Sequence, residues 1–249
     1  MHQRTAFPAA ACSFAMIVDE NVSVFIDSLY KDGDAFMEAL REEAERDSIP
    51  IIRRQSEGFL KSLLLMKRPQ RILEIGTGIA YSSIFMAFTL PQCTVTTVEN
   101  YAPRITRAKE NIKKALLQER IKLVEGDAAE VLPSLEGSYD FVFLDGPKGQ
   151  YAAFLPEILR LLEDGGVLLA DNVLAGGSIA LSRFALERRQ RTIHERLREF
   201  LRDITRCPEL ETSILTVADG MSLSVKLPEK PDSNGFWSTD DTEKTEKGY

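Results

Sequence analysis

From residue 71 onward, short apolar runs alternate with longer stretches in which apolar residues recur every three or four positions. The short runs are typical of buried strands, and the longer stretches are typical of amphipathic helices. The expected strands are RILEIG, TVTTVE, IKLVEG, YDFVFLDG and GGVLLADN. Strands and helices that alternate at this spacing form a parallel sheet with helices on both faces. The pattern therefore predicts a doubly wound α/β fold.

The pattern changes at both ends of this region. Between Val22 and Met66 it is helical, with Ser56 as a possible N-cap residue. A long helix is expected from about Ile179 to Thr205. The last two apolar runs, ETSILTV and MSLSVKL, flank a turn at residues 218–220 and predict a β-hairpin, so one strand must run antiparallel to the rest. The buried stripe of the long helix is expected to consist of Ile193, Leu197, Phe200, Leu201 and Ile204.

The folded region is expected to be a single domain over residues 16–227. Residues 228–249 are polar and acidic and contain Pro, Gly and Ser, which predicts a disordered tail. Residues 1–15 are expected to be a disordered N-terminal extension. A weak secretory signal is the alternative for this end, but Pro8 and Ser13 interrupt its apolar run.

Composition narrows the class of protein. The 249 residues are 44% hydrophobic and 28% charged, which is ordinary for a soluble globular protein and excludes a mostly disordered or fibrous chain. No apolar run reaches the roughly 18 residues that a membrane span needs, so no membrane partner is expected. Three scattered cysteines and two histidines argue against a zinc site and favour a reducing, cytoplasmic setting.

The net charge of −7 argues at first against a nucleic-acid partner. Its distribution weakens that argument. Residues 32–47 carry seven acids and two arginines (−5), and residues 227–249 carry six acids and three lysines (−3), so the remainder has a net charge of +1. Residues 183–202, in contrast, hold seven arginines and three glutamates. The total net charge therefore excludes only a protein that is basic throughout. DNA is not expected as a partner.

Candidate ligand-binding residues follow the first three strands. In open α/β sheets, ligands bind at the carboxyl ends of the strands. The stretch from Glu74 to Ser82 contains Gly76 and Gly78, which allow a tight turn and a close ligand approach; alone, they equally fit an ordinary glycine-rich turn. Tyr81 occupies the place of the third small residue in the dinucleotide fingerprint, which argues against NAD.

Two further polar positions suggest a nucleoside. Glu99 closes the second strand, where a carboxylate can accept hydrogen bonds from a ribose diol, although a solvated strand-end carboxylate is the alternative. Asp127 and Ala128 follow the third strand, where a side chain and a backbone amide could contact adenine. Together with the glycine loop, these residues favour a nucleoside-containing cofactor.

Oxygen-bearing side chains also follow the fourth and fifth strands. Asp145, Asp171 and Asn172 are expected at one edge of the sheet, where an oxygen-only donor set suits Mg²⁺ or another hard divalent cation. Alternatively, Asp171 and Asn172 only begin a loop. Lys148 follows Asp145 by three residues; beside a dication its pKa should fall, which would make it a general base. The spacing alone fits a solvated surface lysine equally well.

The ordered set of strings RILEIGTGIAYSS, TTVE, EGDA, FLDGPK and LLADNVL resembles the cation-dependent class I O-methyltransferases. This family includes catechol and caffeoyl-CoA O-methyltransferases and bacterial tRNA 5-hydroxyuridine methyltransferases. The resemblance covers about residues 50–226 and implies a Rossmann-like sheet, S-adenosylmethionine as methyl donor, and an enzyme that is commonly a homodimer. The cofactor-binding residues that it implies are Ile52, Glu74, Gly76, Ser82, Glu99, Asp127, Ala128 and Asp145.

The same resemblance implies roles for the other candidate residues. It implies a metal held by Asp145, Asp171 and Asn172, with Lys148 and Asp145 as catalytic residues. DNVLAGG followed by RRQRT, and the ending ADGMSLSVK, look more like the tRNA enzymes than the small-phenol enzymes. The favoured substrate is therefore tRNA wobble 5-hydroxyuridine, whose O5 and O4 form a vicinal pair. The expected RNA-binding residues are Arg188, Arg189, Arg191 and Arg198.

Two alternatives to this substrate remain. One is an O-methyltransferase acting on small catechols or other phenols. The other is a nucleotide-binding module without catalysis, against which the joint presence of Asp145, Lys148, Asp171 and Asn172 argues.

Overall fold

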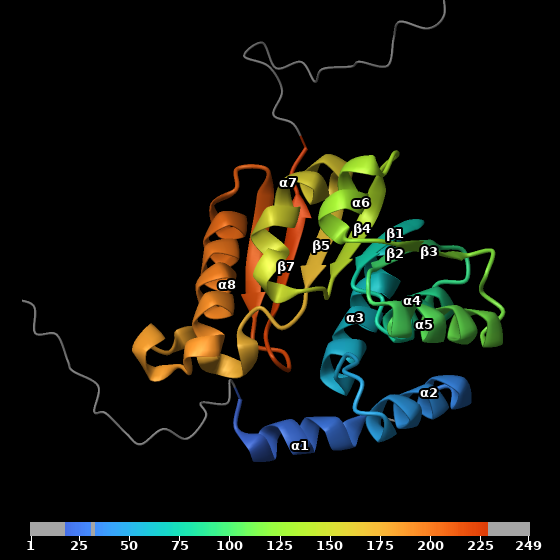
Figure 1. Cartoon of the computed structure of the whole chain (residues 1–249), viewed down its shortest axis with the longest axis horizontal. Coiled ribbons are helices and arrows are strands. Elements are labelled where there is room, and N and C mark those ends of the chain that lie inside the picture. Colours follow the sequence, from blue (N-terminus) through green and yellow to red (C-terminus); the bar gives the residue numbers. More distant parts are fainter. Residues whose placement is uncertain (1–17, 31–32, 229–249) are drawn as a thin grey trace, which may run out of the picture.

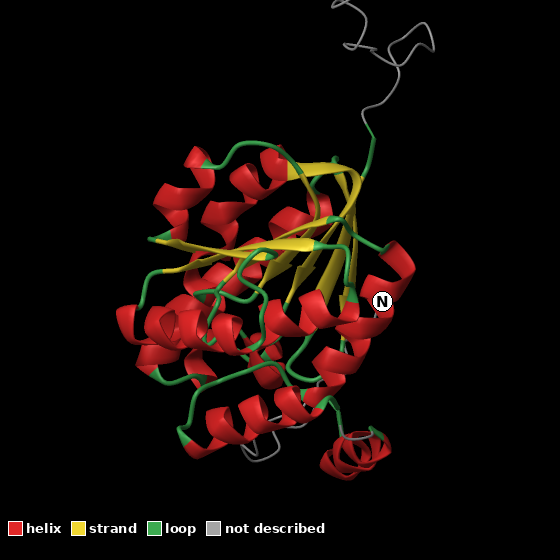
Figure 2. Cartoon of the chain, turned by 90° about the vertical axis from the view of Figure 1, so that its right-hand side faces the viewer, coloured by secondary structure: helices red, strands yellow, loops and turns green. Residues whose placement is uncertain are grey.

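The computed structural model describes residues 18–30 and 33–228, apart from the side chain of Arg183. The expected N-terminal extension, and all but the first residue of the expected acidic tail, lie outside these ranges. The described chain forms one sheet with helices packed on both of its faces (Figures 1 and 2). No helix among the described residues is long and apolar enough to span a bilayer.

Seven strands of the described chain form the sheet in the order β3-β2-β1-β4-β5-β7-β6. The first five in the chain pair in parallel, whereas β7 lies between β5 and β6 and is antiparallel to both. This confirms the predicted Rossmann-like sheet with its closing hairpin. The strands are β1 (Arg71–Ile75), β2 (Thr94–Glu99), β3 (Ile121–Glu125), β4 (Tyr139–Leu144), β5 (Leu162–Ala170), β6 (Leu210–Leu215) and β7 (Met221–Lys226).

Alternating strand residues supply two hydrophobic cores, one on each face of the sheet. On β1, Ile72 belongs to one core, and Leu73 and Ile75 belong to the other. The first core contains residues of α2 (Ala35–Arg46), α3 (Arg54–Lys67), α4 (Tyr81–Thr89) and α5 (Ala102–Lys114). The second contains residues of α6 (Ala128–Ser134), α7 (Tyr151–Leu161) and α8 (Arg188–Arg206). The remaining helix, α1 (Glu20–Leu29), has no buried residue.

The long helix after β5 begins later than predicted. α8 starts at Arg188, and the chain before it forms two 3₁₀ segments, η2 (Ala175–Ala180) and η3 (Arg183–Ala185). Gly176 and Gly177 have positive φ angles of 62° and 90°, which interrupt helical geometry. Arg198 then donates from Nε to the carbonyl of Ile179 (3.0 Å), so this segment folds back along α8 instead of extending it.

Two local predictions were also wrong by a small shift. In α8, Ile193 is 47% exposed, and the neighbouring His194 is buried instead. Both positions fit the helical spacing to Leu197, so only the packing of the helix selects between them. Ser56 does not cap α3, because the helix begins two residues earlier at Arg54 and Ser56 lies buried in its first turn.

Candidate active site

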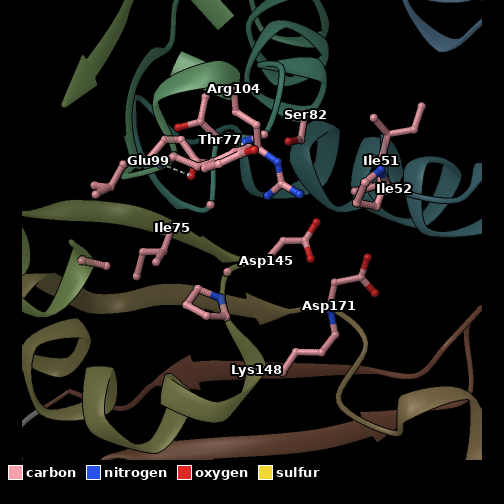
Figure 3. A pocket seen from close by; sticks show the side chains of 18 of the residues that line it. Ile51, Ile52, Ile75, Thr77, Ser82, Glu99, Arg104, Asp145, Lys148 and Asp171 are labelled. Atoms are coloured by element: carbon pink, nitrogen blue, oxygen red, sulfur yellow. Dashed lines mark hydrogen bonds between the residues drawn. The ribbon is translucent and has the colours of Figure 1, made fainter. Parts of the chain in front are cut away.

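A cavity of about 670 Å³ opens at the carboxyl ends of β1 to β5 (Figure 3). Its walls are the loops that follow these strands, together with residues 50–53 between α2 and α3 and Asp219 in the β6–β7 turn. The volume lies within the range of roughly 300–1,000 Å³ that is typical of small-molecule sites. All predicted cofactor-binding, metal-binding and catalytic residues except Glu74 line it: Ile52, Gly76, Ser82, Glu99, Asp127, Ala128, Asp145, Lys148, Asp171 and Asn172.

Gly76 is required by a close approach of two loops. Its φ angle is 101°, and a Cβ atom at this position would lie 2.3 Å from the carbonyl oxygen of Asp145. Only glycine tolerates both conditions without displacing the backbone. The loops after β1 and β4, which carry different candidate groups, are therefore held next to each other.

Glu99 organises the glycine loop from the end of β2. Its buried carboxylate accepts hydrogen bonds from the backbone N–H groups of Gly78 (3.0 Å), Asn100 (3.1 Å) and Tyr101 (3.0 Å). A carboxylate has about four acceptor positions. Glu99 thus lies at the cavity wall with acceptor capacity left for a ligand hydroxyl.

Glu74 is the exception among the predicted cofactor-binding residues, because it lies behind the cavity wall. It is fully buried and accepts hydrogen bonds from the hydroxyls of Ser82, Ser83 and Thr97, the last at 2.6 Å. Burial raises the pKa of Glu74 to about 7, although the three hydroxyl donors oppose the rise. Glu74 therefore holds Ser82 in place from beneath the site.

The raised pKa of Glu74 makes a prediction about stability. An acid with a pKa of about 7 in the folded state and 4.5 in the unfolded state makes the free energy of unfolding fall as pH rises between these values. Between pH 5 and pH 8 we expect a loss of about 2–3 kcal/mol from this group. Urea unfolding of the wild type and of Glu74→Gln should show this difference in pH dependence.

A matched control for this experiment is Glu136→Gln, which changes an exposed carboxylate in the same way. It should keep the pH dependence of the wild type. If Glu74→Gln also kept it, Glu74 would be ionised in the folded protein throughout this range.

Asp145 and Asp171 lie side by side at the ends of β4 and β5. The register pairs Leu144 with Ala170, and the N–H of Asp171 donates to the carbonyl of Leu144 (3.0 Å). Asp171 is 2% exposed, and Asp145 is half-buried. Figure 3 shows both side chains, with Lys148 beside them, at the same end of the cavity.

The environment of these aspartates disfavours two negative charges. Shielding from water raises the pKa of Asp145 to about 8, and the charge of Asp171 adds to the rise. Burial raises the pKa of Asp171 to about 6, opposed first by the N–H of Asn172. The charge of Lys148 lowers both pKa values, but neither carboxylate forms an ion pair with a described residue.

This donor set fits a hard divalent cation. No group of three or more His, Cys, Asp or Glu side chains among the described residues is arranged as a metal site. Asn172, next to Asp171 in the chain, lines the same cavity and offers an amide oxygen as a further donor. Asn172 has a φ angle of 57°, a left-handed conformation that asparagine adopts more readily than most residues. Two close carboxylates and an amide are the oxygen ligands that Mg²⁺ takes.

The four predicted RNA-binding arginines do not line the cavity in the described structure. Arg191 donates from Nε to the carbonyl of Leu186 (3.1 Å), and Arg198 donates to Ile179. Arg189 pairs with Glu187 (2.7 Å), and Arg188 is exposed. Two of the four thus hold the segment before α8 in place.

The sequence profile of the O-methyltransferase family matches residues 27–227. This chain belongs to that family. Among O-methyltransferases, it is 32% identical to the catechol O-methyltransferase of Mycobacterium tuberculosis, over 64% of this chain and 74% of the relative. It is 33% identical to the catechol O-methyltransferase of Niastella koreensis, over 64% and 76%. These matches confirm the predicted O-methyltransferase family and enzyme class; they show neither the cation dependence nor the tRNA substrate.

Solved structures agree with this assignment. The SAH-bound methyltransferase PaMTH1 of Podospora anserina superposes with a TM-score of 0.75 and 26% sequence identity, over 83% of this chain and 94% of that one. The alignment therefore includes almost the whole of the PaMTH1 chain. The likeness supports the fold.

Parts of this O-methyltransferase site were not predicted from the sequence. Arg104, in the first turn of α5, points into the cavity, and its charge lowers the pKa of Asp145 (Figure 3). The sequence signal that could have identified Arg104 is its position five residues after Glu99, just beyond the end of β2. Asp219 lines the cavity from the hairpin turn and pairs with Arg53 (2.9 Å). This contact joins distant segments of the chain, so no local sequence pattern could predict it.

Proposed function

We propose that this O-methyltransferase moves the methyl group of S-adenosylmethionine to one oxygen of a vicinal pair and requires a divalent cation. The observation that carries the proposal is the pair of carboxylates, Asp145 and Asp171, in the same cavity as the glycine loop and Glu99. Asp145, Asp171 and Asn172 would hold the cation. When bound, it would neutralise the carboxylates and lower the pKa of a coordinated hydroxyl.

The cofactor would lie along the glycine loop. Glu99 would accept hydrogen bonds from its ribose hydroxyls, and Asp127 and Ala128 would contact its adenine. Ile52 would cover it from the α2–α3 connection, and Ser82 would contact it from α4. The SAH-bound state of the Podospora anserina relative supports this assignment. The cofactor supplies an electrophilic methyl group on a sulfonium.

Lys148 would act on the acceptor. Lys148 lines the same cavity as Asp145 and Asp171, and Figure 3 shows it at their end of the cavity. As a neutral amine, Lys148 would take the proton of the acceptor hydroxyl, leaving an oxyanion aligned with the methyl carbon. Oxygen–carbon bond formation and sulfur–carbon bond cleavage would then occur together, and the sulfur would leave as a neutral thioether.

For the acceptor, we favour a small catechol or a related phenol over tRNA. Both relatives compared above are named catechol O-methyltransferases. Arg191 and Arg198 each use Nε to hold a backbone carbonyl, which ties them to the segment before α8 and leaves only their terminal nitrogens for a phosphate.

tRNA wobble 5-hydroxyuridine is the second candidate, on one observation. α8 packs against η1 (Lys148–Gln150), where Arg196 donates to the carbonyl of Gly149 (3.1 Å). The exposed Arg188 and Arg189 therefore belong to a helix that reaches the wall of the site.

An assay with two acceptors tests the proposal. Purified protein with S-adenosylmethionine and Mg²⁺ should methylate 3,4-dihydroxybenzoate, and a chelator should abolish the activity until Mg²⁺ is restored. tRNA from cells lacking this protein should gain little methyl label. Turnover that persists in the chelator would overturn the cation requirement. Methylation of 5-hydroxyuridine without turnover of the catechol would establish the tRNA substrate instead.

The homodimer expected from the family resemblance stays a prediction. α1 exposes Val24 (63%), Phe25 (62%) and Leu29 (64%), an apolar surface of the kind that association covers. Light scattering of the purified protein checks the homodimer prediction, because a dimer has twice the mass of one chain.

A further inference from the structure

A buried charged cluster lies behind the part of the cavity wall formed by the α2–α3 connection. Arg41 of α2 is 7% exposed and pairs with Glu57 of α3. The Arg41 guanidinium also donates to the hydroxyl of Tyr81 (2.8 Å) and lies 4.8 Å from the centre of its ring. The Tyr81 hydroxyl in turn donates to Glu57 (2.8 Å). The three side chains thus form a closed set of contacts.

The same guanidinium reaches the wall of the cavity. Both terminal nitrogens of Arg41 donate to the carbonyl oxygen of Ile52, each at 3.3 Å. Ile52 and Tyr81 both line the cavity, one from the α2–α3 connection and the other from the start of α4 after the glycine loop. Arg41 therefore connects two segments of the wall that are about 30 residues apart in sequence.

Stability alone does not explain this cluster. Burying an ion pair costs desolvation that the pairing often only offsets. In addition, Arg41 Nε has no hydrogen-bond partner among the described residues. α2 and α3 are already joined by Arg54 and Glu38, with two hydrogen bonds of 3.0 and 2.5 Å, and by the apolar core. The feature that Arg41 adds is the fixed position of the Ile52 carbonyl relative to Tyr81.

We propose that Arg41, Glu57 and Tyr81 are positioning residues. They hold residues 50–53, the part of the α2–α3 connection that includes Ile52, over the cofactor. This inference rests on the proposed function, because it requires S-adenosylmethionine to occupy the cavity. Arg41 does not touch the cavity itself and acts through Ile52 and Tyr81. If the wall is already ordered before the cofactor binds, the binding free energy does not have to include the entropic cost of ordering the wall. The cluster should therefore affect cofactor affinity more than the chemical step.

Two substitutions test the cluster in the full-length protein. Tyr81→Phe removes one hydroxyl and keeps the ring, and Arg41→Lys keeps the charge but loses the forked donors. Each should raise the Kd of S-adenosylhomocysteine by titration calorimetry, and the KM of S-adenosylmethionine, about 10-fold. kcat and the KM of the acceptor should stay within about 2-fold. The double variant should bind hardly more weakly than Arg41→Lys, because both changes break one network.

Arg54→Lys is the matched control. It weakens the other ion pair between α2 and α3, next to the cluster but outside the cavity lining. It should lower the melting temperature while leaving the Kd of S-adenosylhomocysteine within about 2-fold of the wild type. A purely structural role for the cluster would instead give all three single variants the same pattern.

The outcomes separate this inference from the proposed function. Wild-type affinity in Tyr81→Phe and Arg41→Lys would overturn the positioning role. If Arg41→Lys does not fold, Tyr81→Phe decides alone, because it removes a single atom. If the wild type itself does not bind S-adenosylhomocysteine, the proposed function fails, and the inference fails with it.

Discussion

Asp145→Asn should abolish methyl transfer, lowering kcat about 1,000-fold, and should at the same time stabilise the metal-free protein. The carboxylate is one of the proposed cation ligands. The amide of asparagine has nearly the same shape but carries no net charge, so it binds a cation more weakly. The same change removes one of two neighbouring acids whose pKa values are raised by shielding from water. Loss of activity with a higher melting temperature would distinguish a lost ligand from a damaged fold.

Steady-state kinetics and thermal unfolding in the presence of a chelator check this prediction. Calorimetric titration with Mn²⁺ adds a readout that does not depend on turnover, and binding to the variant should be weakened or lost. Asp164→Asn makes the same chemical change at an exposed position of β5 and should behave as the wild type. Normal turnover by Asp145→Asn would show that Asp145 is not a required ligand.

Lys148→Met should lower kcat by about 100-fold or more and leave the KM of S-adenosylmethionine nearly unchanged. General-base assistance typically contributes about 10²–10⁴-fold. Methionine keeps much of the length of the side chain and cannot accept a proton. Lys148 also lowers the pKa of Asp145 and Asp171 through its charge, so turnover should be measured at saturating Mg²⁺, which keeps both carboxylates ionised.

Acceptor acidity gives this prediction a sharper test. A nitrocatechol, whose hydroxyl ionises more readily, needs less help from a base, so Lys148→Met should be impaired less with it than with catechol. Lys122→Met, on the exposed side of β3, is the matched control and should keep wild-type kinetics with both acceptors. Equal impairment with both acceptors would assign Lys148 a purely electrostatic role.

The local pattern was enough to predict the sheet. In an alternating α/β chain, each strand is a short apolar run, so both its existence and its place in the order are visible in the sequence. The carboxyl ends of parallel strands also meet at one edge. For this reason, residues just after the strands, such as Glu99, Asp145 and Asp171, could be placed in one site before any contact was known.

The order of apolar runs and polar residues along the chain was enough to predict which residues follow which strand, and from them the family and the edge of the sheet at which the cavity lies. Tertiary packing alone decided the rest. It buried His194 rather than Ile193, and it placed Glu74 behind the cavity wall. It also joined Arg41 to Ile52 and Tyr81. These features depend on contacts between segments that are far apart in the chain. The spacing of residues within one helix or strand does not indicate such contacts.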